Sequence, residues 1–220
     1  PATNVPTVNT STSVVADGGR SVTFAILEYD IPQGSLVEFT ITNVTTPTRA
    51  AIGGYNTTVT TLSKHLNVID GPSLIDTAAV ATGTVVGLKT FNTSVDTPAY
   101  TSTAEVSFTT AGSVPIGGRI KVVLPALSGL QEGWVIGASA EVNFSVPVDN
   151  KPLVPSAVVV GSDGRSVTFE IAGHAIEQST AVVFTISNVT TPTRQVLAGS
   201  STSITTFDSS GNIINSAADV

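Results

Sequence analysis

The chain has 220 residues, of which 41% are hydrophobic and only 11% charged, against about 25% charged residues in typical soluble domains. A net charge of −7 argues against a nucleic-acid partner, and the absence of cysteine excludes disulfides, thiolate catalysis and cysteine-bound zinc. No apolar run approaches the roughly 20 residues that a membrane-spanning helix needs, so we expect no membrane span and no signal peptide.

Residues 1–80 are expected to form a first β-sandwich module, of type A. Apolar and polar side chains alternate at residues 22–26, which is the period of a strand buried on one face. The preceding Asp-Gly-Gly at residues 17–19 predicts a tight turn, because glycine supplies positive φ. The expected elements, in chain order, are strands at 14–15, 22–26 and 37–41, with a polar turn at 32–34, then a Thr-Thr-Pro-Thr-Arg corner at 45–49 and strands around Val59 and at 68–69.

The stretch at residues 2–10 is a candidate for a strand that is donated to, or links, a neighbouring subunit. It contains Val5 and Val8 and no glycine, while Pro6 favours an edge position. We therefore expect Val5 and Val8 to make inter-subunit contacts.

Residues 81–152 are expected to form a divergent module, of type B. Val106-Ser-Phe108 resembles Val22-Thr-Phe24, and apolar residues alternate at 120–124 and 140–146. A stiff, proline-bearing linker is expected at 149–155.

Residues 153–220 repeat type A. Residues 20–24 return as 165–169 and residues 43–49 return as 188–194, and both offsets are 145 (165 − 20 and 188 − 43). A constant offset indicates two copies under the same packing constraints. The order A, B, A, with short strands and glycine turns, predicts an all-β fold of tandem small Ig-like β-sandwich modules arranged end to end.

The sequence offers no catalytic or metal-binding arrangement. His65 and His174 do not occupy equivalent places in the repeat, and both are expected in solvated loops. The acidic residues are scattered and form no calcium-loop motif. We expect no enzyme activity, no cofactor and no metal.

The six Asn-x-Ser/Thr sequons are the most specific chemical signal. Asn143 is expected to point outward, because it lies between the inward-facing Val142 and Phe144. The recurrence of Asn43 as Asn188 has two explanations, a glycan or an asparagine that caps a turn through its side chain. The candidate glycosylation sites are Asn9, Asn43, Asn56, Asn92, Asn143 and Asn188.

The repeated Thr-Thr-Pro-Thr-Arg corner also has two interpretations. Arg49 and Arg194 either dock a neighbouring subunit or hydrogen-bond within their own module, where Pro47 and Pro192 set the corner. Trp134 is expected to pack in a core and not to form a carbohydrate platform.

The phrase Ile-Thr-Asn-Val-Thr-Thr-Pro at 41–47, together with Val-x-Phe and Ile-Pro-x-Gly-x-Leu at 22–24 and 31–36, resembles the Thr-rich, Ig-like tandem repeats of very large extracellular proteins. Such repeats occur in algal and protist surface filaments and in bacterial adhesins. The resemblance implies a structural subunit of an extracellular or cell-surface glycoprotein filament that self-associates and carries covalent glycans.

Two alternative functions remain open at the level of sequence. The first is an adhesin stalk or binding module that recognises carbohydrate or protein through the loops of the B module. The second is an accessory repeat region of a secreted enzyme whose catalytic domain lies elsewhere. The start at Pro1 without a methionine is expected of a processed protein or of a piece of a longer one.

Overall fold

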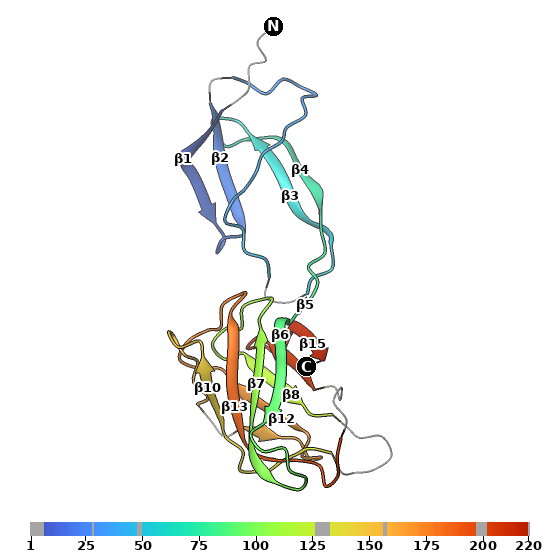
Figure 1. The fold of residues 1–220 in the computed structure, drawn as a ribbon. Helices are drawn as coiled ribbons and strands as arrows, with labels where there is room; N and C mark the ends of the chain where they lie inside the picture. Colours follow the sequence, from blue (N-terminus) through green and yellow to red (C-terminus); the bar gives the residue numbers. More distant parts are fainter. Residues whose placement is uncertain are drawn as a thin grey trace. The chain divides into compact units, whose positions relative to one another are not determined.

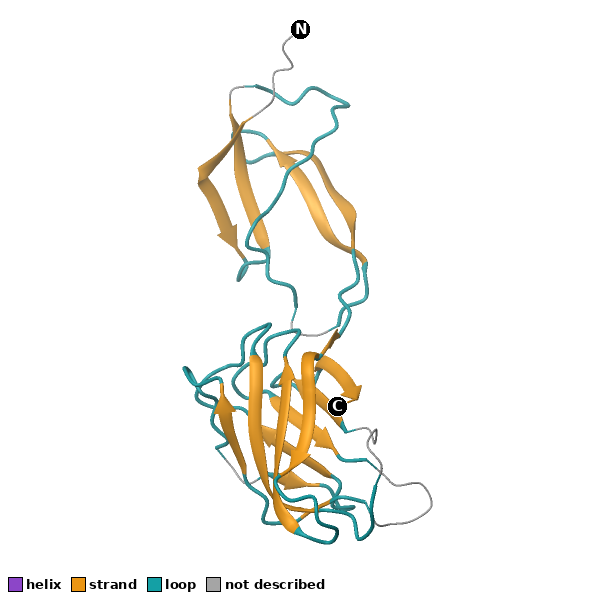
Figure 2. Ribbon diagram, in the orientation of Figure 1, coloured by secondary structure: helices purple, strands orange, loops and turns teal. Residues whose placement is uncertain are grey.

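The computed structural model describes residues 7–27, 29–47, 50–125, 133–155, 158–196 and 202–219. These residues form strands, turns and extended segments without any helix, which confirms the all-β class (Figure 2). Among the described residues there is accordingly no helix with the length and apolar character to cross a membrane. The chain divides into two compact units, Pro1–Thr45 and Thr46–Val220.

Two antiparallel hairpins supply the strands of the first 80 residues (Figure 1). The turn of the first hairpin contains Asp17, Gly18 and Gly19, all with positive φ, as the Asp-Gly-Gly sequence predicts. The hairpins are β1 (Thr7–Ala16) with β2 (Ser21–Leu27) and β3 (Gly54–Leu62) with β4 (Val68–Thr77).

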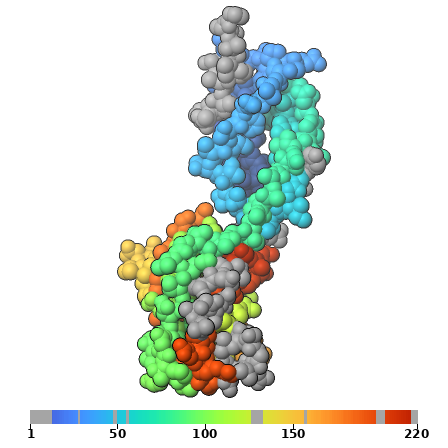
Figure 3. All heavy atoms as spheres, turned by 45° about the vertical axis from the view of Figure 1, so that its right-hand side comes forward, coloured from blue at the N-terminus to red at the C-terminus, as the bar shows by residue number. Residues whose placement is uncertain are grey.

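The described residues between 83 and 219 form a β-sandwich of two sheets. One sheet has the strand order β10-β13-β7-β6, in which β9 also pairs with β13, and the other has the order β11-β12-β8-β14-β15-β5. The parallel pairing of β5 with β15 joins an early strand to the last one, so green and red atoms meet on the surface (Figure 3). The strands are β5 (Gly83–Thr84), β6 (Val86–Thr93), β7 (Thr101–Thr109), β8 (Arg119–Val123), β9 (Val135–Ile136), β10 (Val142–Val146), β11 (Val159–Val160), β12 (Ser166–Glu170), β13 (Ala181–Thr190), β14 (Ser203–Phe207) and β15 (Ile213–Asp219).

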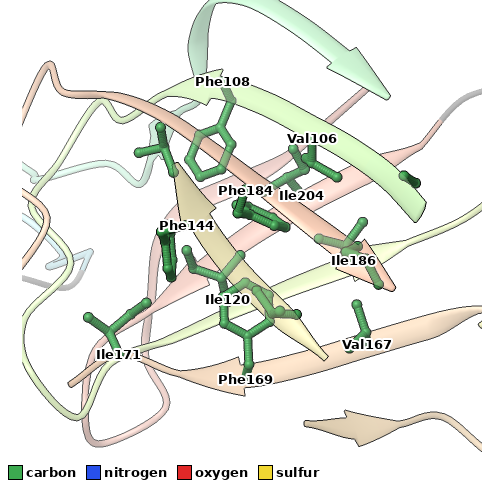
Figure 4. Close-up of a cluster of buried hydrophobic side chains, with 14 of the residues drawn as sticks. Val106, Phe108, Ile120, Phe144, Val167, Phe169, Ile171, Phe184, Ile186 and Ile204 are labelled. Carbon is green, nitrogen blue, oxygen red and sulfur yellow. The ribbon is translucent and has the colours of Figure 1, made fainter. Parts of the chain in front are cut away.

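The core lies between these two sheets, because apolar residues alternate along the strands of both (Figure 4). On β13, for example, Val182, Phe184 and Ile186 are fully buried. Phe184 stands at the centre of an aromatic cluster whose ring centroids are 5.2–6.4 Å from its own. Each such aromatic pair adds about 0.5–1.5 kcal/mol beyond its buried area. The partners of Phe184 are Phe108, Phe144 and Phe169.

The expected division into modules 81–152 and 153–220 does not match the strand pairing. β8 lies between β12 and β14, and β13 lies between β7 and β10, so strands from both segments alternate in both sheets. The B segment and the following A segment therefore share one core. Neither segment could bury its apolar faces alone, since each lacks the neighbouring strands that the other supplies.

The two A segments repeat backbone structure as well as sequence. The four residue pairs of β14–β15, with the two register shifts between them, recur in β3–β4 at an offset of 145 positions. The pairs of β11–β12 recur in β1–β2 at the same offset. Four positions with positive φ recur at this offset. In two of the four pairs, a glycine in one copy corresponds to a different residue in the other copy. They are Gly19 and Gly164, Gly34 and Ser179, Asn43 and Asn188, and Leu66 and Gly211.

The predicted strand at residues 37–41 is not formed. Residues 37–42 have no ladder partner, and Val37, Phe39 and Ile41 are 47–50% exposed. The equivalent β13 receives its hydrogen bonds from β7, β9 and β10, all of which belong to the B segment. The alternating sequence is thus compatible with a strand, but no B strand flanks it here.

Candidate functional site

The sequons fall into three groups in the structure. Asn92 on β6 and Asn143 on β10 are exposed, and the outward orientation predicted for Asn143 is confirmed. Asn43 is exposed in a bend that follows the extended segment, and Asn188 is half-buried on β13. Asn9 and Asn56 lie on β1 and β3, but their side chains are outside the described part of the structure.

Asn188 has the geometry of a structural residue. Its backbone adopts φ 57°, and its side-chain Nδ2 donates a hydrogen bond to Ser139 Oγ at 3.0 Å. Its carbonyl accepts a hydrogen bond from the Gly137 amide at 2.8 Å, and a Cβ at Gly137 would clash with the Asn188 amide group. Because an N-linked glycan would be attached to the same Nδ2 atom, this packing favours the turn-capping interpretation at Asn188.

Asn43 adopts the same left-handed conformation, with φ 58°, although its side chain is exposed. Asparagine tolerates this region better than most residues, which explains its recurrence at both positions. The partners of Asn188, Gly137 and Ser139, belong to the B segment.

We expect Asn188→Ala to destabilise the sandwich by about 1–2 kcal/mol, because alanine is strained at positive φ and leaves Ser139 without its amide partner. Asn188→Gly should recover part of this loss, since glycine removes only the backbone strain. Urea unfolding followed by the fluorescence of Trp134, the one tryptophan, measures both variants. Equal stability of the wild type and Asn188→Ala would contradict a structural role.

The repeated Thr-Thr-Pro corner is packed against the B segment in the second A copy. Buried Thr191 donates through Oγ1 to the Thr97 carbonyl at 2.5 Å and accepts from the Tyr100 amide at 3.0 Å. The carbonyl of buried Pro192 accepts from the Ala99 amide at 2.9 Å. These bonds support the interpretation in which the corner is architectural.

The other candidate contact residues are placed only in part. Arg194 is described and exposed, while Arg49 and Val5 lie outside the described residues. Val8 lies on β1 opposite Ile26 of β2. Residues 7–9 of the stretch 2–10 thus pair with residues 25–27 within their own hairpin. The inter-subunit contacts expected of Val5 and Val8 stay a prediction.

An ion pair lies between Asp163 and Arg165. In the turn before β12, the backbone amide of Arg165 donates to Asp163 at 3.0 Å, and the Arg165 guanidinium lies 3.3 Å from the same carboxylate. These interactions lower the pKa of Asp163, the backbone hydrogen bond most strongly. His65 and His174 are both exposed in turns, as predicted. No group of three or more potential metal ligands occurs among the residues described.

Trp134 is half-buried against the core, and its ring meets Phe91 edge-on with a centroid distance of 6.3 Å. This confirms the expectation that it packs in a core.

The sequence pattern gave no indication of a buried polar pair inside the sandwich, in which Thr206 and Asn215 hydrogen-bond to each other. Thr206 and Asn215 lie 145 positions after Thr61 and Asp70, which hydrogen-bond to each other in the first copy.

No protein-family model and no curated protein matches the chain. Among solved structures it is similar to one described as the crystal structure of BslA, a bacterial hydrophobin. The match has 15% sequence identity and a TM-score of 0.32, and it covers 60% of this chain and 94% of that one. A likeness at this level establishes neither a shared fold nor a shared function.

Proposed function

We propose that the chain is a structural segment of an extracellular glycoprotein filament or surface fibre, built from repeated Ig-like β-sandwich units. The observation that carries the proposal is the recurrence of strand register and of positive-φ positions at a constant offset of 145. A unit whose sequence and strand register repeat with this fidelity is suited to building length.

The outward faces of the strands support the same proposal. Hydroxyl groups pair across neighbouring strands, as between Thr101 and Thr190 at 2.8 Å and between Thr90 and Ser107 at 2.6 Å. These faces carry many hydroxyl groups and few charged side chains, such as Glu105 and Arg119, so little charge repulsion opposes dense lateral packing. Cross-strand threonine and serine pairs also stabilise a sheet by roughly 0.2–1 kcal/mol each.

Two of the exposed sequons, Asn92 and Asn143, lie on the two strands that end one sheet. Asn143 is on β10, which pairs with β13 alone, and Asn92 is on β6, which pairs with β7 alone. A glycan on an edge strand would block unwanted strand addition, to which exposed edges are prone. In the proposed fibre, glycans therefore restrict contacts between subunits to other surfaces.

Glycopeptide mass measurement on native material tests this proposal, together with electron microscopy of the same sample. We expect added hexose-type mass on peptides containing Asn92 and Asn143, unmodified peptides containing Asn188, and elongated particles. The peptide with Asn188 serves as the internal control, because its amide nitrogen is engaged. A monodisperse monomer of unmodified mass would contradict the proposal.

A further inference from the structure

The first A copy exposes the apolar side chains that the second copy buries. At eight equivalent positions the exposed fraction is 37–69% in the first copy and at most 7% in the second. The side chains are chemically the same at seven of the eight positions, so composition does not cause the difference. The exposed set is Val22, Ile26, Val37, Phe39, Ile41, Val44, Val59 and Ile69, and the buried set is Val167, Ile171, Val182, Phe184, Ile186, Val189, Ile204 and Ile214.

The B segment is what buries the second set. Its strand β8 joins β12 to β14, which do not pair with each other, and its strands β7 and β10 flank β13. An A segment alone can therefore form two hairpins, but it cannot connect them into a sheet or form its central strand. The first copy shows this arrangement: two separate hairpins and an unpaired extended segment at residues 37–42.

The first copy nevertheless retains the local geometry of the completed sandwich. Phe24 and Phe39 meet edge-on at 5.2 Å, as their counterparts Phe169 and Phe184 do. Thr61 donates to Asp70 at 2.7 Å, in the place of the bond between Thr206 and Asn215. In the second copy, residues of the B segment also contact these groups: Phe108 and Phe144 contact Phe184, and Gly112 donates to Asn215. The first copy has no such B residues.

We propose that residues 1–75 are the second half of a sandwich whose first half is another B-type segment, preceding them in the same polypeptide. In the second sandwich the B segment runs directly into its A segment, and the positions equivalent to 1–75 are 146–220 (146 − 145 and 220 − 145). Counted by this offset, the B segment covers residues 76–145 instead of the 81–152 expected from the sequence. It is already paired with the A segment that follows it, and the same holds in any second copy of this chain. The repeating unit is thus a B–A sandwich of 145 residues. The proposal goes beyond the fibre function and does not depend on it, because it concerns folding alone.

The contacts within the existing sandwich predict which contacts the added segment would make. Residues equivalent to Phe108 and Phe144 would cover Phe39, as those two cover Phe184. A serine and a glycine equivalent to Ser139 and Gly137 would engage Asn43. An amide equivalent to that of Gly112, which donates to Asn215 at 3.0 Å, would donate to the Asp70 carboxylate.

The experiment adds a second copy of residues 76–145 in front of Pro1 of the complete chain, giving 290 residues (70 + 220). Hydrogen–deuterium exchange is then compared between this fusion and the unmodified chain at low concentration. We expect amides at residues 36–45 to exchange at least about 100-fold more slowly in the fusion, because they gain strand partners and a core. We also expect the fusion to show a second cooperative unfolding transition. Phe39→Ala should lower the midpoint of that transition, although the same substitution should have little effect in the unmodified chain.

The matched control carries Phe108→Asp and Phe144→Asp in the added copy only, and it should show no added protection. Strand β13, which lies outside the duplicated residues, reports in every sample that the original sandwich is folded. Three outcomes would overturn the proposal: residues 36–45 exchanging equally fast in the fusion, aggregation of the fusion but not of its control, or protection already present in the unmodified chain. If that last protection appears only on dimerisation, the occupant is a second copy.

Discussion

Replacing Phe184 by alanine is expected to lower the free energy of unfolding of the sandwich by about 3–5 kcal/mol, the range for removing a buried phenylalanine. Phe184 is fully buried and contacts three other rings, so truncation leaves a cavity lined by both sheets. Since domains of this size are stable by roughly 5–15 kcal/mol, much of the folded margin would be lost. Urea unfolding monitored by Trp134 fluorescence measures the change.

Phe39→Ala is the matched control, because Phe39 is the same residue at the equivalent position of the first A copy. It is 47% exposed and has one ring partner, Phe24. The same truncation should change the stability of the sandwich by less than about 0.5 kcal/mol. Similar losses for Phe39→Ala and Phe184→Ala would show that the two copies are packed alike, against the structure.

The local elements could be predicted from the sequence because their causes are local. Alternation at residues 22–26 and 120–124 corresponds to β2 and β8, and glycine at position 19 marks a tight turn. The choice of strand partners could not be predicted. Nothing in the alternation at residues 120–124 indicates that β8 pairs with β12 and β14 of the following segment. The resemblance of residues 106–108 to residues 22–24 therefore led to the expectation of two separate modules where the strands form one sandwich.

The candidate site divides along the same line. Exposure of Asn143 follows from parity within one strand, and the structure agrees. The role of Asn188 depends on Gly137 and Ser139, which lie about 50 positions earlier and reach it only through β9 and the turn that follows. A sequon is identical in both settings, so the triplet alone cannot distinguish a glycan acceptor from a residue that caps a turn.

Asn215→Ala is expected to cost the sandwich about 3 kcal/mol. Asn215 is fully buried, its Oδ1 accepts from the Gly112 amide at 3.0 Å, and its Nδ2 donates to Thr206 Oγ1 at 2.6 Å. Alanine would leave the half-buried Gly112 amide without its partner, while the buried Thr206 hydroxyl would keep only the hydrogen bond from the backbone amide of residue 215. An unsatisfied buried group costs about 1–3 kcal/mol. The midpoint of urea unfolding should fall with little change in its slope.

Asp70→Ala supplies the comparison at the equivalent exposed position. Asp70 accepts from Thr61 Oγ1 at 2.7 Å, yet both groups are exposed and water replaces the lost bond. Its effect on the sandwich transition should be within about 0.5 kcal/mol. If Asp70→Ala lowers the stability as much as Asn215→Ala does, the first copy is buried in solution. If only Asn215→Ala has a large effect, the loss of stability comes from the contact between the A and B segments.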